Sequence, residues 1–203
     1  MAAKSSSAFG VVLLIIMPVI DATFRDRVIE ALWSSPSARG LSVWAILDCA
    51  RDERIYPALR NSQLDYLCLF SGRLHLEVVA AAPHLIELSP NYTFTPKLIE
   101  MAWGQSWGVF LRIKDAANLR THLRGFLRVR NESGRILMFR YYDPRVLRVY
   151  LSTCRADELR TVFGPISSYA VEAEDGRSLI EFEFDGTQLH ERRITLTGAS
   201  AQA

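Results

Sequence analysis

The chain has 203 residues, of which 49% are hydrophobic, enough for one sizeable core and too few for several independent domains. Its 24 Lys and Arg residues and 22 Asp and Glu residues leave a net charge of +2, so no global field favours nucleic acid as a partner. Three cysteines are odd in number and far apart, and four histidines do not cluster, which favours reduced, buried thiols in a cytoplasmic protein and excludes a structural zinc site.

The first feature along the chain is an apolar segment, residues 1–22, with a hydrophobic run from Ala8 to Ile20. The run has the length of a signal-peptide core and is too short to span a membrane. Lys4 alone is a weak charged region for an export signal, and no clear pair of small residues marks a cleavage point. Export, docking of the run on the domain, and a tail produced by an upstream start codon are the alternatives.

Strands and helices alternate over residues 23–114, which predicts an N-terminal α/β lobe. Thr23 can cap a first helix that ends at Trp33, before a loop rich in Ser, Pro and Gly. The other elements expected here are strands at 42–47, 66–70, 85–88 and 109–113, and helices at 52–60, 74–82 and 95–102.

Asp48 follows the strand at 42–47, where open α/β sheets hold their ligands. It could hold a metal or a ribose, or it could cap the next helix or pair with a buried arginine. No glycine-rich phosphate loop accompanies it, which favours the structural roles.

Residues 115–186 predict a C-terminal α+β lobe rich in hairpins, followed by a tail over residues 187–203 with some strand content at 193–196. Its expected elements are helices at 115–126 and 156–163, a hairpin of 127–130 with 135–141, and a hairpin of 168–174 with 178–184. Glu181, Glu183 and Asp185 alternate with apolar residues, which predicts one acidic face. The fold class expected for the whole chain is α/β, a mixed sheet with flanking helices.

The most distinctive stretch joins the strand at 135–141 to a helix that begins at Asp143. Asp143 has a side chain suited to an N-cap, and Pro144 is tolerated in a first helical turn. Arg140, beside this junction, can pair through its planar guanidinium with Asp48, Asp143 or backbone carbonyls. We therefore predict a structural role for Asp48, Arg140, Asp143 and Pro144.

Two tryptophan-glycine pairs within residues 103–108 interrupt the chain before the strand at 109–113. Such a turn fits either a buried corner of the core or an aromatic patch for a partner. Tryptophan, tyrosine and arginine dominate protein interfaces, although each aromatic here could equally be core. The candidate partner-binding residues are Trp103, Trp107, Tyr141, Tyr142 and Arg145.

The chain contains no nucleophile elbow, His-Glu-x-x-His motif, phosphate loop or paired metal cluster. We therefore predict a protein that is not an enzyme, with no catalytic residue, metal or cofactor. The alternative is an α/β enzyme or nucleotide-binding module that uses Asp48 and Arg140.

An ordered series of short motifs covers most of the chain between Val43 and Phe182. The motifs are Leu47-Asp48, Arg51-Asp52, Ile55-Tyr56-Pro57, Cys68-Leu69-Phe70, Ala82-Pro83-His84-Leu85, the tryptophan-glycine turn at 103–108, the run 139–146 and Phe163-Gly164-Pro165. Together they resemble the adaptor proteins of bacterial type VI secretion, a domain long catalogued as of unknown function. The resemblance implies a cytoplasmic, noncatalytic chaperone that binds a cognate toxin, the effector, and loads it onto the spike protein VgrG.

Overall fold

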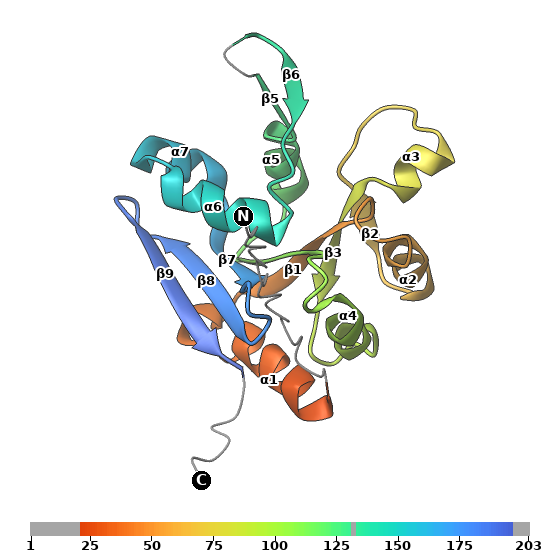
Figure 1. Cartoon of the computed structure of the whole chain (residues 1–203), viewed down its shortest axis with the longest axis vertical. Helices are drawn as coiled ribbons and strands as arrows, with labels where there is room; N and C mark the ends of the chain where they lie inside the picture. The colour runs from red at the N-terminus through yellow and green to blue at the C-terminus, as the bar shows by residue number, and fades with distance from the viewer. Residues whose placement is uncertain (1–20, 131–132, 197–203) are drawn as a thin grey trace, which may run out of the picture.

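A computed structural model describes residues 21–130 and 133–196. Its centre is a seven-stranded sheet with the strand order β2-β3-β1-β4-β7-β8-β9 (Figure 1). The strands are β1 (Ser42–Asp48), β2 (Tyr66–Cys68), β3 (Pro83–Leu88), β4 (Gly108–Ile113), β7 (Ile166–Glu172), β8 (Ser178–Phe184) and β9 (Leu189–Thr195). Strands from both predicted lobes therefore join one sheet.

The α/β class expected from the sequence is confirmed, but every neighbouring pair in this sheet is antiparallel. A mixed sheet was expected because strands and helices alternate in the first half. The strand order explains the difference. β3 is inserted between β1 and β2, so these two strands run in the same direction without being neighbours.

Helices cover both faces of the sheet. One face packs on α1 (Ala22–Trp33), α2 (Ile55–Asn61) and α4 (Phe94–Ala102), and the other on α5 (Leu119–Gly125), α6 (Pro144–Thr153) and α7 (Ala156–Phe163). Successive side chains of a strand point to opposite faces. Accordingly, Ile46 of β1 lies in the core under α5 to α7, whereas Ala45 and Leu47 lie in the core under α1, α2 and α4.

Two small elements lie outside these layers. β5 (Arg128–Arg130) and β6 (Ile136–Met138) form a separate hairpin, and α3 (Leu76–Ala80) is a short helix after β2. Figure 1 shows both standing out at the upper end of the molecule, away from the centre of the sheet. Every residue of the two hairpin strands is exposed, and α3 has no buried residue. A 3-10 turn at Pro36–Ala38 completes the elements described.

Several boundaries differ from those expected. Asp21 rather than Thr23 caps α1, because the N–H of Phe24 donates to Asp21 Oδ1 at 2.7 Å. The strand expected at 135–141 ends at Met138, so a turn separates it from α6. β9 lies in the region expected to be a tail.

The predicted acidic face of β8 is wrong at Glu181. This side chain is 1% exposed, because it lies on the face that α1 covers and pairs there with Arg112.

All three cysteines are free, and only Cys49 is buried. The apolar run at 8–20 lies outside the described residues, as do residues 131–132 of the hairpin loop. None of the helices in residues 21–130 and 133–196 combines the length and apolar character needed to cross a membrane.

Candidate functional site

Asp48, the last residue of β1, forms an ion pair with Arg140 from the turn that precedes α6. The Asp48 side chain is 1% exposed and the Arg140 side chain 42% exposed. Within the described part of the chain, the second carboxylate oxygen, Oδ1, is buried without a hydrogen-bond partner. Burial raises the pKa of Asp48, although the hydrogen bond from Arg140 opposes the rise. Arg140 therefore compensates a buried carboxylate, which fits the structural role expected for both residues.

Asp143 and Pro144 begin α6 at the expected position. Asp143 Oδ1 accepts from the backbone N–H of Arg145 at 3.0 Å and from its Nε at 2.9 Å, and Oδ2 accepts from its Nη2 at 2.5 Å. Burial opposes ionisation of Asp143, but the hydrogen bonds from Arg145 outweigh it and lower the pKa. Asp143 thus caps the N-terminus of α6 and holds the Arg145 side chain, which remains 50% exposed.

Arg140→Ala is expected to lower the free energy of unfolding by about 1–3 kcal/mol near neutral pH, because it leaves the Asp48 carboxylate buried and unpaired. The loss should shrink as the pH falls. The pKa of Asp48 is higher in the folded than in the unfolded chain, so the folded state binds the proton more tightly and protonation removes the unpaired charge. Urea denaturation at about pH 5 and at neutral pH measures both effects.

Asp48→Asn in the Arg140→Ala background is the matched control. It removes the charge and keeps the shape, so the extra pH dependence should disappear. If Arg140→Ala instead melts like the parent at neutral pH and loses partner binding, Arg140 belongs to an interface rather than to the architecture.

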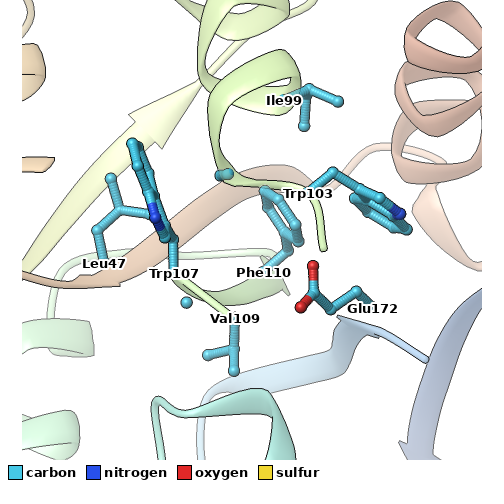
Figure 2. A pocket seen from close by; sticks show the side chains of 9 residues that line it. Leu47, Ile99, Trp103, Trp107, Val109, Phe110 and Glu172 are labelled. Atoms are coloured by element: carbon cyan, nitrogen blue, oxygen red, sulfur yellow. The ribbon is translucent and has the colours of Figure 1, made fainter. Parts of the chain in front are cut away.

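The tryptophan turn after α4 is packed core (Figure 2). Trp103 is 4% exposed and Trp107 is 1% exposed. The indole N–H of Trp103 donates to the carbonyl of Gly176 at 2.8 Å, and that of Trp107 donates to Asp52 Oδ2 at 3.2 Å. The void beside them measures about 10 Å³, at the lower limit for a single water molecule. Such a void cannot hold a ligand.

Glu172, near the tryptophans in Figure 2, fixes the backbone of this turn from β7. Its carboxylate accepts from the N–H of Gly104 at 2.5 Å, from the N–H of Ser106 at 2.8 Å and from the Ser106 hydroxyl at 3.1 Å. Burial raises the pKa of Glu172, and these hydrogen bonds oppose the rise. Gly108 is required as well, because a Cβ there would lie 1.9 Å from the carbonyl oxygen of Ile46. No local pattern in the sequence singles out Glu172.

The tyrosines of the candidate set are also internal. Tyr141 is 0% exposed and Tyr142 is 2% exposed, and the Tyr141 hydroxyl donates to the carbonyl of Leu123 at 2.8 Å. Four of the five candidate partner-binding residues are therefore buried and, in this conformation, cannot touch a partner. These are Trp103, Trp107, Tyr141 and Tyr142, whereas Arg145 is exposed.

The structure also places Cys49 beside His84, a contact that no pattern in the sequence indicates. Cys49 Sγ lies 3.4 Å from His84 Nδ1, because β1 and β3 are neighbours in the sheet. Burial raises the pKa of the Cys49 thiol to about 12 and lowers the pKa of His84. The thiol therefore stays protonated at neutral pH, whereas a nucleophilic cysteine needs the thiolate. In the described part of the chain, His, Cys, Asp and Glu form no group of three or more placed to hold a metal.

An open groove of about 520 Å³ lies between α3 and the β5–β6 hairpin, and we call it the α3–hairpin groove. Its floor and walls are lined by Leu69, Phe70, Ser71, Leu74, Val78, Arg124, Gly125, Leu127, Arg128 and Met138. The exposed apolar side chains of α3 and the hairpin are Leu76, Val78, Val129, Ile136, Leu137 and Met138, each more than a third exposed. Of these, Val78 and Met138 line the groove, so exposed apolar side chains meet there from both walls, and a concave apolar surface of this kind marks a binding site for another molecule. From the sequence, residues 74–82 are expected to be a helix and residues 127–130 and 135–141 a hairpin, and none of the groove-lining residues is a candidate partner-binding residue.

Comparison with known proteins assigns part of the chain to a family. A family described as a domain of unknown function (DUF4123) matches residues 43–161, more than half of the chain. The matched region runs from β1 into α7 and contains α3, the hairpin and the Asp48–Arg140 pair. No curated protein and no solved structure matches the chain.

Proposed function

The chain belongs to the DUF4123 family of domains of unknown function, and from this premise we propose that it is a noncatalytic adaptor for one type VI secretion toxin. It binds the cognate toxin in the cytoplasm, keeps it soluble and brings it to the spike protein VgrG before secretion. Most of the motifs that resemble the type VI adaptors lie within residues 43–161, the region that the family covers.

The α3–hairpin groove is the observation that carries this proposal. Leu76 is 70% exposed, Ile136 62% and Met138 47%, on two elements that contribute no buried residue to the core. Leaving large apolar side chains in water forfeits about 1.5–3 kcal/mol of burial energy for each. A partner protein that covers them recovers this energy, which is the task of an adaptor.

The internal polar residues support the noncatalytic part of the proposal. Asp48 and Arg140 pair with each other, Asp143 caps α6 with Arg145, and Glu172 holds a turn. Each group thus has an architectural partner. Cys49, the cysteine beside a histidine, is held in its unreactive protonated form.

The experiment is copurification from the native cell. One toxin and VgrG should copurify with a tagged copy of the chain and be identified by mass spectrometry of the bound proteins. The same toxin, expressed alone, should be poorly soluble, and coexpression with this chain should keep it in the soluble fraction. A strain that lacks the secretion genes provides the control for nonspecific capture.

Copurification of neither protein from cells that express the neighbouring genes would contradict the proposal. Release of a bound nucleotide on denaturation would favour the alternative module built on Asp48 and Arg140.

A further inference from the structure

The α3–hairpin groove has two walls of low intrinsic stability. α3 contains five residues, and an isolated helix of that length is unstable in water. The opposite wall is a two-stranded hairpin, which is marginal unless a further strand or helix packs on it. Both walls therefore gain from a molecule that fills the space between them.

The hairpin register shows which of its side chains face the groove. Arg128 pairs with Met138, and Arg130 pairs with Ile136. Directly opposite residues share a face, and residues two apart along a strand share it too. Since Arg128 and Met138 line the groove, Arg130 and Ile136 lie on the same face of the hairpin. This face carries both apolar and positively charged side chains.

The charge of the groove has one sign. Arg124 from α5 and Arg128 from β5 line it, and its lining contains no carboxylate. The guanidinium group of neither arginine forms an ion pair or hydrogen bond with another described residue, in contrast to that of Arg120, which donates twice to the carbonyl of Cys68. Unpaired guanidinium groups at the edge of an apolar groove favour a ligand that brings carboxylates to them.

We infer that the α3–hairpin groove binds an amphipathic, acidic segment of the toxin. The apolar side of the segment covers Leu74, Val78 and Met138, and its carboxylates meet Arg124 and Arg128. The inference rests on the proposed function and adds the surface and the chemistry of the ligand to it. Residues 1–20 of this chain are apolar too, but they contain no Asp or Glu and cannot supply the carboxylates.

The test uses the full chain, tagged and coexpressed with the toxin that copurifies with it from the native cell. Met138→Asp places a charge on the apolar part of the groove, and Arg128→Glu reverses the charge at its edge. Val149→Asp and Arg155→Glu are the matched controls, because Val149 is 68% exposed on α6 and the Arg155 side chain is 77% exposed before α7. All four sites are exposed, so thermal melting should match the parent in each variant.

Each groove variant should lower the amount of captured toxin by about tenfold or more, and each control should leave it within about twofold. High salt should weaken capture by the parent and have less effect on the residual capture by Arg128→Glu. Unchanged capture by both groove variants, with normal capture by the parent, would overturn the groove inference and leave the proposed function intact. If the parent itself captures no toxin, the proposed function fails.

A photoreactive benzoylphenylalanine in place of Met138 identifies the occupant. The expected crosslink joins position 138 to a toxin segment that contains both apolar and acidic residues, and the same group in place of Val149 should not form it. Crosslinks to residues 1–20 of this chain, to a second copy of it, or to a toxin segment without carboxylates would overturn the inference.

Discussion

Arg112→Ala is expected to lower the free energy of unfolding by about 3–5 kcal/mol, the largest stability loss of any single substitution considered. Arg112 lies in β4 and is 0% exposed. It forms a buried ion pair with Glu181, and it donates to the carbonyls of Leu32 and Ala31 at 2.9 Å each. Those carbonyls end α1 and have no partner within the helix, so Arg112 joins the helix to the sheet.

Burial lowers the pKa of Arg112 to about 10, which still leaves the guanidinium charged at neutral pH. Its removal therefore leaves Arg192 as the remaining ion-pair partner of the buried Glu181 carboxylate and leaves the last carbonyls of α1 without their donor. The loss would be a large fraction of the total stability of a domain, which is about 5–15 kcal/mol. Urea denaturation monitored by circular dichroism measures it.

Arg155→Ala is the control for the Arg112 experiment. It removes an arginine whose side chain is 77% exposed, and it should change the free energy of unfolding by no more than about 0.5 kcal/mol. The double variant Arg112→Met with Glu181→Leu should recover part of the loss, because no buried charge is then left unpaired and Arg192, the other partner of Glu181, is 47% exposed to water. If Arg112→Ala alone unfolds at the parent's urea concentration, the pair does not hold α1 on the sheet.

The sequence predicted those parts of the fold that depend on neighbours along the chain. Asp143 and Pro144 specify the start of α6 by their own side-chain chemistry, and the structure begins the helix there. Strand pairing depends on residues far apart in the chain. Alternating strands and helices therefore predicted the mixed α/β class but not the insertion of β3 between β1 and β2.

Glu181 shows why the alternating pattern of β8 was misleading. Charged residues at every second position usually face water. Here Arg112 on β4 and Arg192 on β9 both pair with the Glu181 carboxylate, so the side chain can be buried. The signal available in the sequence was Arg112 itself, a charge within the apolar strand 108–113.

The sequence could not show, for a related reason, whether the candidate partner-binding residues lie in the core or on the surface. Tryptophan and tyrosine are enriched both in cores and in interfaces, so residue type alone does not distinguish the two locations. Trp107 and Tyr141 are core residues, whereas Ile136 and Met138 are exposed on a hairpin that is separate from the seven-stranded sheet. Only the three-dimensional arrangement reveals which apolar side chains lack a cover.

Deletion of the gene for this chain is expected to abolish delivery of one toxin and to leave delivery of unrelated effectors unchanged. The toxin loses its only proposed route to VgrG, so the effect should be all-or-none rather than partial. Complementation with the parent should restore delivery. Complementation with Met138→Asp should restore much less delivery, and complementation with Val149→Asp should restore it fully, because Met138 lines the groove and Val149 does not.

Killing of toxin-sensitive target cells by the deletion strain measures the proposed adaptor function at its end point. Target cells sensitive only to an unrelated effector provide the internal control in the same assay. If the chain is the adaptor of this toxin, the first target should survive at the level seen with a strain that lacks the secretion apparatus, and the second should be killed normally. Normal killing of the first target without this chain would show that the chain is not the adaptor of this toxin, and equal loss of killing of both targets would show a general role in the apparatus instead.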